Sequence, residues 1–173
     1  EYFYIDSTER KFRTDELALS FRYAPGEQTN TMFGKRFVRT PGNPVIEVKY
    51  KQGLNLFSDT GLVYSKIEAA FSVSLYKGRI GHSLLRMTAG MVDRDLPYNQ
   101  LFTGFGSYDP SFRFIVHNHF QTMKPYEFLS DRYVNLFYSH NFGNRFISDR
   151  YIKPKFTVYQ NAGYGVLSKP ENH

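Results

Sequence analysis

The residues best suited to chemistry are three histidines in the second half of the chain. His117 and His119 lie two positions apart in a run with strand character, so their side chains share one face; His140 falls on a later run that can lie beside it. Imidazole is a common zinc ligand, which makes a metal site one interpretation. The chain has no cysteine, and no carboxylate stands at ligand spacing among the three histidines. We therefore interpret the three histidines as hydrogen-bonding residues, at the rim or in the lumen of the strand structure predicted below, and we predict no metal.

A second candidate set combines Glu127, Asp131 and Arg132 with His119 or His140. These groups have the chemistry of general acids and bases, but no nucleophile stands at a spacing that would complete a catalytic set. We interpret them as residues that cap a loop and form ion pairs across a sheet. The sequence thus predicts no catalytic residue and no cofactor.

The elements that position these residues are strands, because apolar and polar side chains alternate with a period of two along most of the chain. Leu17, Leu19 and Phe21 would share one face, with smaller and polar residues between them. The pattern predicts strands at 13–24, 44–52, 64–76, 82–91, 112–120, 131–141 and 154–167. The third and fourth of these would form a hairpin.

The predicted connections differ in length and composition. In an outer-membrane barrel short turns lie in the periplasm and long loops lie outside the cell. If the predicted strands form such a barrel, 77–81 would be periplasmic and the loops 25–43 and 92–111 would lie outside the cell. The stretch 92–130 has too many aromatic residues for a solvated loop. We expect it to fold back against the wall or into the lumen.

The charged residues of the predicted strands fall on the face opposite the apolar rows. Tyr133 and Phe137 also fall on the polar side of their strand, which indicates a filled or narrow lumen. The residues predicted to carry lumenal charges are Glu47, Lys49, Lys66, Glu68 and Arg86.

Composition favours strands at a membrane interface. With 14 Tyr and 17 Phe the chain is 18% aromatic, a bias that suits β structure and interfacial belts. No stretch approaches the roughly 20 apolar residues of a spanning helix. The net charge of +6 comes from scattered basic residues. We therefore predict no nucleic-acid partner and place the basic loops near anionic lipid headgroups.

The fold class predicted from these observations is all-β, an antiparallel transmembrane β-barrel. The chain shows neither an initiator Met nor a signal sequence, which we interpret as a piece of a larger barrel with strands missing at both ends. Residues 1–173 would then be part of one outer-membrane β-barrel domain.

Several runs of the sequence resemble one family. The segment 120–137 reads FQTMKPYEFLSDRYVNLF and is followed by HNFGN at 140–144 and QNAGYG at 160–165. With PVI at 44–46 and YKQG at 50–53, they resemble an uncharacterised outer-membrane β-barrel family of Bacteroidota, whose members carry a carboxypeptidase-like regulatory domain before the barrel. The resemblance implies a place in the bacterial outer membrane and contact with its lipid and lipopolysaccharide. It leaves a complex with other envelope proteins open.

That family is distantly similar to the surface-antigen barrels that assemble or export outer-membrane proteins. In those, a long loop with an Arg-Gly-Tyr motif folds into the lumen; residues 92–130 hold the equivalent place but lack the motif. The resemblance implies a docked loop, with Phe128 wedged among side chains and Arg132 paired with Glu47 or Glu68. The residues predicted to dock are Tyr126, Glu127, Phe128, Asp131, Arg132 and Tyr133.

The predicted function is a role in envelope biogenesis, protein assembly or transport, without enzymatic activity. Two alternatives stay open: a soluble β-barrel that binds an apolar ligand in its interior, and an outer-membrane hydrolase. A soluble barrel buries its apolar face, whereas a membrane barrel shows that face to lipid and keeps its charges inside.

Overall fold

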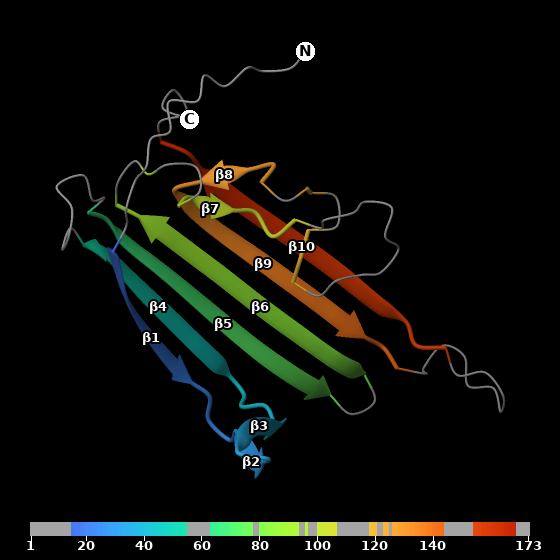
Figure 1. Ribbon diagram of the computed structural model, residues 1–173. Helices are drawn as coiled ribbons and strands as arrows, with labels where there is room; N and C mark the ends of the chain where they lie inside the picture. Colours follow the sequence, from blue (N-terminus) through green and yellow to red (C-terminus); the bar gives the residue numbers. More distant parts are fainter. Residues whose placement is uncertain are drawn as a thin grey trace.

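The computed structural model describes residues 15–54, 63–77, 80–93, 96, 100–106, 118–120, 123–124, 126–143 and 154–168. Within these ranges the chain is all-β, its sheets are antiparallel and it has no helix. The main sheet has six strands in the order β1 (Asp15–Tyr23), β4 (Val45–Leu54), β5 (Ser65–Lys77), β6 (Gly81–Val92), β9 (Arg132–Asn141) and β10 (Thr157–Val166) (Figure 1). The described strands form an open sheet, with β1 and β10 at its edges.

The six strands of the main sheet confirm six of the predicted strands, and β5 and β6 confirm the predicted hairpin. The seventh prediction, 112–120, falls mostly on residues outside the described ranges. Its described part, 118–120, holds a turn and an isolated bridge from Phe120 to Gly106. In the main sheet β6 pairs directly with β9, so no strand from 112–120 lies between them.

Two smaller sheets occupy opposite ends of the main sheet (Figure 1). β2 (Gln28–Met32) and β3 (Lys35–Thr40) form a hairpin at the end where β5 turns into β6, and β7 (Phe102–Thr103) pairs with β8 (Leu129–Ser130) at the other end. Phe33 and Gly34 both have positive φ at the β2–β3 turn. This geometry matches the twist of a tight hairpin.

The placement corrects two predictions from the sequence. Residues 25–43 are a hairpin and not a plain loop, because short exposed strands such as β3 give no apolar alternation to detect. They also lie at the same end as the short turn between β5 and β6, not with the long 92–111 connection. Each strand reverses the direction of the one before, so connections separated by two strands of the main sheet return to one end.

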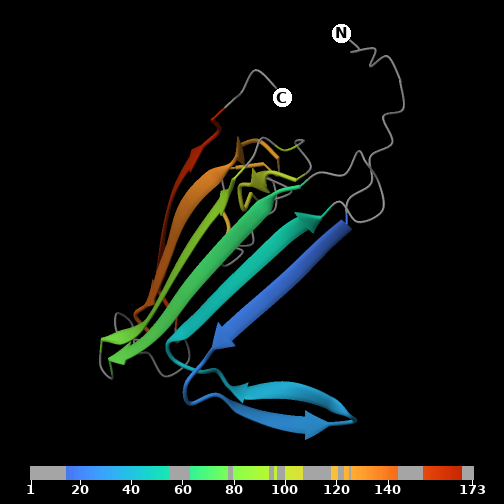
Figure 2. The same cartoon turned by 90° about the vertical axis from the view of Figure 1, so that its left-hand side faces the viewer.

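The register aligns apolar residues into rows that cross the whole sheet on one face. Direct cross-strand partners place the six strands' residues Phe21, Val48, Ala69, Ala89, Val134 and Tyr164 in one such row. Many of these side chains are open to the surroundings; Leu19 is 70% exposed and Tyr164 is 72% exposed. Figure 2 shows the six strands as a single twisted layer, and no described part of the chain forms a second layer over this face.

Among the described residues, five of the six buried apolar side chains gather at one end of the sheet, and the sixth, Phe137, lies in the middle of β9. Tyr64, Val92, Leu96, Leu101 and Phe102 form the cluster, packed against Leu129, Tyr133 and Leu167. Burial, together with a hydrogen bond to the Glu16 carboxylate, raises the pKa of the Tyr64 hydroxyl. The core therefore lies where the 93–131 connection meets the ends of β5, β6 and β9.

The close approach of Gly81, at the start of β6, to the end of β9 gives a test of the strand pairing. Gly81 has a φ of 114°, and a Cβ on it would lie 2.1 Å from the carbonyl oxygen of Asn141. Gly81→Ala should lower the free energy of unfolding by about 2–4 kcal/mol, because it adds a backbone clash to a strained φ. The control is Gly26→Ala, which also has positive φ but open space, and should cost only about 1–2 kcal/mol. Urea unfolding of the two variants measures the difference; equal losses would contradict the contact with Asn141.

Candidate functional site

The charged residues predicted to share a face do so. Glu47 on β4 lies between two arginines: its Oε1 is 3.3 Å from Nε of Arg22 and its Oε2 is 3.7 Å from Nη2 of Arg86. Arg86 also donates from Nη1 to Oγ of Ser72 at 3.1 Å. These side chains are about one-third exposed or more, so solvent screens each pair and it adds little to stability. The network fixes orientations across four strands more than it adds stability.

Further charges continue this polar face toward the buried cluster. Lys49 and Glu68 line a small hollow of about 60 Å³ with Tyr133. Lys66 donates to the carbonyl oxygen of Gln100 at 3.0 Å, and its ammonium lies 4.0 Å from the centre of the Phe102 ring. A cation over an aromatic face is attracted by the ring quadrupole. Lys66 therefore attaches the start of the 100–131 connection to the sheet.

Aromatic rings of that connection pack on aromatic rings of the polar face. Phe102 meets Tyr133 edge-on with centroids 4.8 Å apart, and Phe105 meets both Tyr133 and Phe137 at 6.3 and 6.2 Å. Phe120 lies 5.2 Å from Phe137. Each such pair contributes about 0.5–1.5 kcal/mol beyond the area it buries. Phe137 is buried as a result, although it belongs to the polar side of β9.

Two strand glycines provide the space for these rings. A Cβ on Gly90 would lie 2.8 Å from the Phe102 ring, and a Cβ on Gly163 would lie 2.6 Å from the Phe120 ring. Glycine inside a strand often marks such a close approach. Asn161 adds a hydrogen bond at 2.9 Å from its side-chain amide to the carbonyl oxygen of His119. The described residues of 100–131 thus dock on the polar face of β6, β9 and β10, and we call them the docked segment.

Asp131 closes the docked segment at the start of β9. Its backbone nitrogen donates to the carbonyl of Val166 and its carbonyl accepts from Val92, both at 2.9 Å. Its buried carboxylate accepts from the backbone nitrogen of Ser168 at 3.1 Å and from the Ser168 hydroxyl. Asp131 therefore holds the ends of β6, β9 and β10 together.

The other residues predicted to dock behave differently. Tyr133 lies among the docked rings, as described above, but Tyr126 is 69% exposed and Phe128 is 60% exposed. Glu127 caps a local turn, accepting at 2.7 Å from the backbone nitrogen of Lys124. The expectation that Phe128 is wedged among side chains is wrong; Phe102 and Phe120 take that role, and the sequence marked them only as part of an aromatic-rich stretch.

The predicted pairing of Arg132 with Glu47 or Glu68 is also wrong. Arg132 stands opposite Met91 and Val166 in the register and lines an apolar groove on the other face of the sheet. Alternate residues of a strand point to opposite faces, so Arg132 is separated from both carboxylates by the sheet itself. Its neighbour Tyr133 makes the ring contacts on the loop side.

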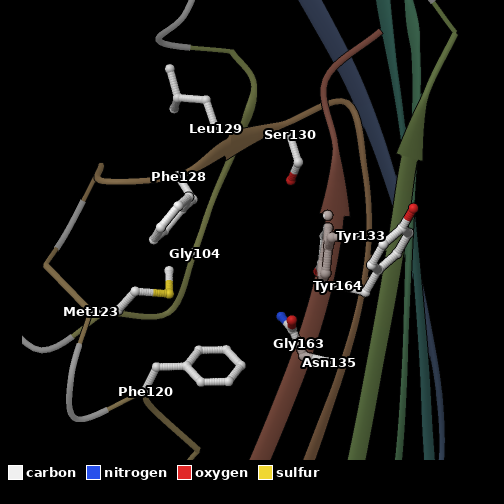
Figure 3. A pocket seen from close by; sticks show the side chains of 11 residues that line it. Gly104, Phe120, Met123, Phe128, Leu129, Ser130, Tyr133, Asn135, Gly163 and Tyr164 are labelled. Carbon is white, nitrogen blue, oxygen red and sulfur yellow. The ribbon is translucent and has the colours of Figure 1, made fainter.

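A cleft of about 330 Å³ remains between the docked segment and the strands. Figure 3 shows Phe120, Met123 and Phe128 on the loop side of this cleft, facing Asn135 and the backbone of β10. Its lining is mainly apolar, with Ser130 and Asn135 as buried polar groups. The cleft is large enough for a small apolar ligand.

The histidines take part in hydrogen bonds. Oγ of Ser83 lies 2.7 Å from Nδ1 of His140, whose Nε2 donates to the carbonyl of Ile80 at 3.2 Å. His119 stacks edge-on against Phe105, and His117 lies outside the described residues. Among the side chains that the structure describes, no three His, Asp or Glu residues come together to hold a metal ion.

Comparisons with protein-family models, curated proteins and solved structures found no match to this chain. In the parts of the chain that are described, no helix is long and apolar enough to cross a membrane. The family resemblance of the 120–165 runs therefore stays a prediction.

The docking can be tested at Gly163. Gly163→Ala places a methyl group 2.6 Å from the Phe120 ring and 2.7 Å from Oδ1 of Asn135, so the ring must move. We expect a loss of about 1–3 kcal/mol in unfolding free energy and faster protease cleavage within 118–130. Ala162→Val, on the opposite face of the same strand, is the control and should change neither. Equal cleavage of both variants would contradict the docked arrangement.

Proposed function

We propose that this chain is the wall of an outer-membrane β-barrel whose polar face carries an inward-docked loop. The observation that carries the proposal is the inverted burial of the sheet. The apolar face is exposed across all six strands, while the polar face holds the buried Thr88, Asn135 and Phe137 beneath the docked segment. Continuous exposed apolar surface on this scale marks contact with lipid or with a partner.

This inversion disfavours the soluble barrel that binds an apolar ligand in its interior. Such a protein would turn Phe21, Val48 and Ala69 inward and cover them. Here the only described segment that packs on the sheet packs on the side of Glu47 and Arg86. In a membrane barrel the same arrangement places the charges in a lumen, away from hydrocarbon.

The length of the apolar rows agrees with this proposal. On β5 the outward residues Ile67, Ala69, Phe71, Val73 and Leu75 cover eight residue steps, about 27 Å along the strand. At the strand tilt of about 40° found in barrels, this becomes roughly 21 Å across the membrane, close to the ~25 Å apolar band of outer-membrane barrels. Charged side chains on that face, such as Asp15 and Arg132, stand at strand ends.

The docked segment is the part of the barrel that carries its specific role. It fills the lumenal side of β6, β9 and β10, so it controls what can pass along or bind within that space. This supports a function in transport or in assembly of envelope proteins, in contact with outer-membrane lipid and lipopolysaccharide, and without catalysis. The resemblance to barrels with an inward-folded loop points to the same role.

Lipid contact can be measured residue by residue because the chain has no tryptophan. Phe21→Trp and Ser20→Trp place single tryptophans on neighbouring residues of β1 that face opposite sides. In vesicles with bromine-labelled acyl chains, Phe21→Trp should show blue-shifted emission and strong quenching, and Ser20→Trp should show little of either. Equal quenching of both, or of neither, would overturn the membrane assignment.

The same chain can report its orientation because it has no cysteine. The β2–β3 hairpin and the short β5–β6 turn share one end, which the short-turn rule places in the periplasm. A bulky, membrane-impermeant maleimide should therefore label Lys124→Cys on whole bacterial cells and leave Lys35→Cys unlabelled. Labelling of Lys35→Cys alone would show that the orientation is reversed.

A further inference from the structure

The apolar face of the sheet is not uniform: it contains a groove of about 380 Å³ across β5, β6, β9 and β10. The floor is formed by the small residues Ala69 and Ala89. Larger side chains border it, with Ile67 and Met91 toward the strand ends and Tyr164 on β10. Its volume lies in the range of ligand-binding clefts, roughly 300–1,000 Å³.

One charged group lies at this groove. Arg132 is the first residue of β9 and stands in the row of Met91 and Val166, one row beyond Ala89 and Tyr164. It is exposed, and none of the described residues that line the groove is a carboxylate. A guanidinium binds phosphate through paired hydrogen bonds. Its position at the strand end would put it at headgroup depth if the sheet crosses a membrane.

We propose that this groove binds one phospholipid, with an acyl chain along Ala69 and Ala89 and the headgroup phosphate at Arg132. The occupant is an anionic phospholipid, because the site offers a cation without a compensating acid and a lining of carbon. This inference rests on the proposed membrane location and adds a defined lipid site to it. Two other occupants fit the groove less well. An uncharged apolar ligand would make no use of the Arg132 guanidinium. A further strand paired with the edge of β10 would lie beside the groove and would not fill the space above Ala69 and Ala89.

The experiment uses Tyr164→Trp as a reporter in the groove and Phe71→Trp as a reporter elsewhere on the apolar face. Each is reconstituted with acyl-brominated phosphatidylglycerol or acyl-brominated phosphatidylcholine diluted into unlabelled phosphatidylcholine. Tyr164→Trp should be quenched at about tenfold lower mole fraction of phosphatidylglycerol than of phosphatidylcholine. Both lipids offer a phosphate to Arg132, but the choline cation of phosphatidylcholine repels the guanidinium and competes with it for that phosphate. Phe71→Trp should not distinguish the two lipids.

Two further changes separate a built site from general attraction to the headgroup layer. In the Tyr164→Trp background, Arg132→Gln should remove the preference for phosphatidylglycerol, and Ala89→Phe should remove it by filling the groove while Arg132 stays. Ala162→Phe, on the same face outside the groove, should leave it intact. A preference that survives Ala89→Phe would overturn the groove and leave only interfacial attraction.

Failure of this inference is distinct from failure of the membrane assignment. If both tryptophans are quenched equally by both lipids, the sheet contacts lipid but the lipid site is wrong. If Phe71→Trp and Tyr164→Trp are quenched by neither lipid, the membrane assignment is wrong and the lipid site with it.

Discussion

The register of the six-stranded ladder is the constraint on which the rest of the structure depends. Each neighbouring pair is aligned so that residues of the same character meet on the same face, from β1 through β4, β5, β6 and β9 to β10. A shift of one residue in any pair would send apolar side chains to the charged side. Only this register allows the ion pairs of Glu47 with Arg22 and Arg86, and only this register places Phe137 where the Phe105 ring contacts it.

The fold was predictable as far as it depends on a period of two. The strands around Phe21, Val48, Phe71, Met87 and Leu136 were predictable from alternation alone, because apolar residues on one face and polar or charged residues on the other leave a readable pattern. The β2–β3 hairpin escaped because exposed residues on both faces leave no such pattern. Closure of the sheet into a barrel belongs to the proposed function, because the described strands form an open sheet with β1 and β10 at its edges.

The site was predictable in kind but less so in detail. An excess of aromatic residues in 92–130 correctly indicated a segment packed on the polar face, yet which rings dock depends on where the strand offers room. Gly90 and Gly163 provide that room, and they select Phe102 and Phe120 over Phe128. The face of Arg132 was predicted wrongly. Its side chain takes the apolar face because β9 already begins at Arg132, and the residue at which a strand begins is hard to place from a sequence.

The docked segment and the sheet are held by different kinds of interaction, and this difference bears on function. The sheet is held by backbone ladders along six strands, whereas the segment is held by a few ring contacts, the Lys66 attachments and the hydrogen bond from Asn161 to His119. Four ring pairs at about 0.5–1.5 kcal/mol each amount to a few kcal/mol. An equilibrium of that size can be shifted by a ligand or partner without unfolding the wall. In the barrel that we propose, this separation would let the loop change its contacts while the strands of the sheet stay paired.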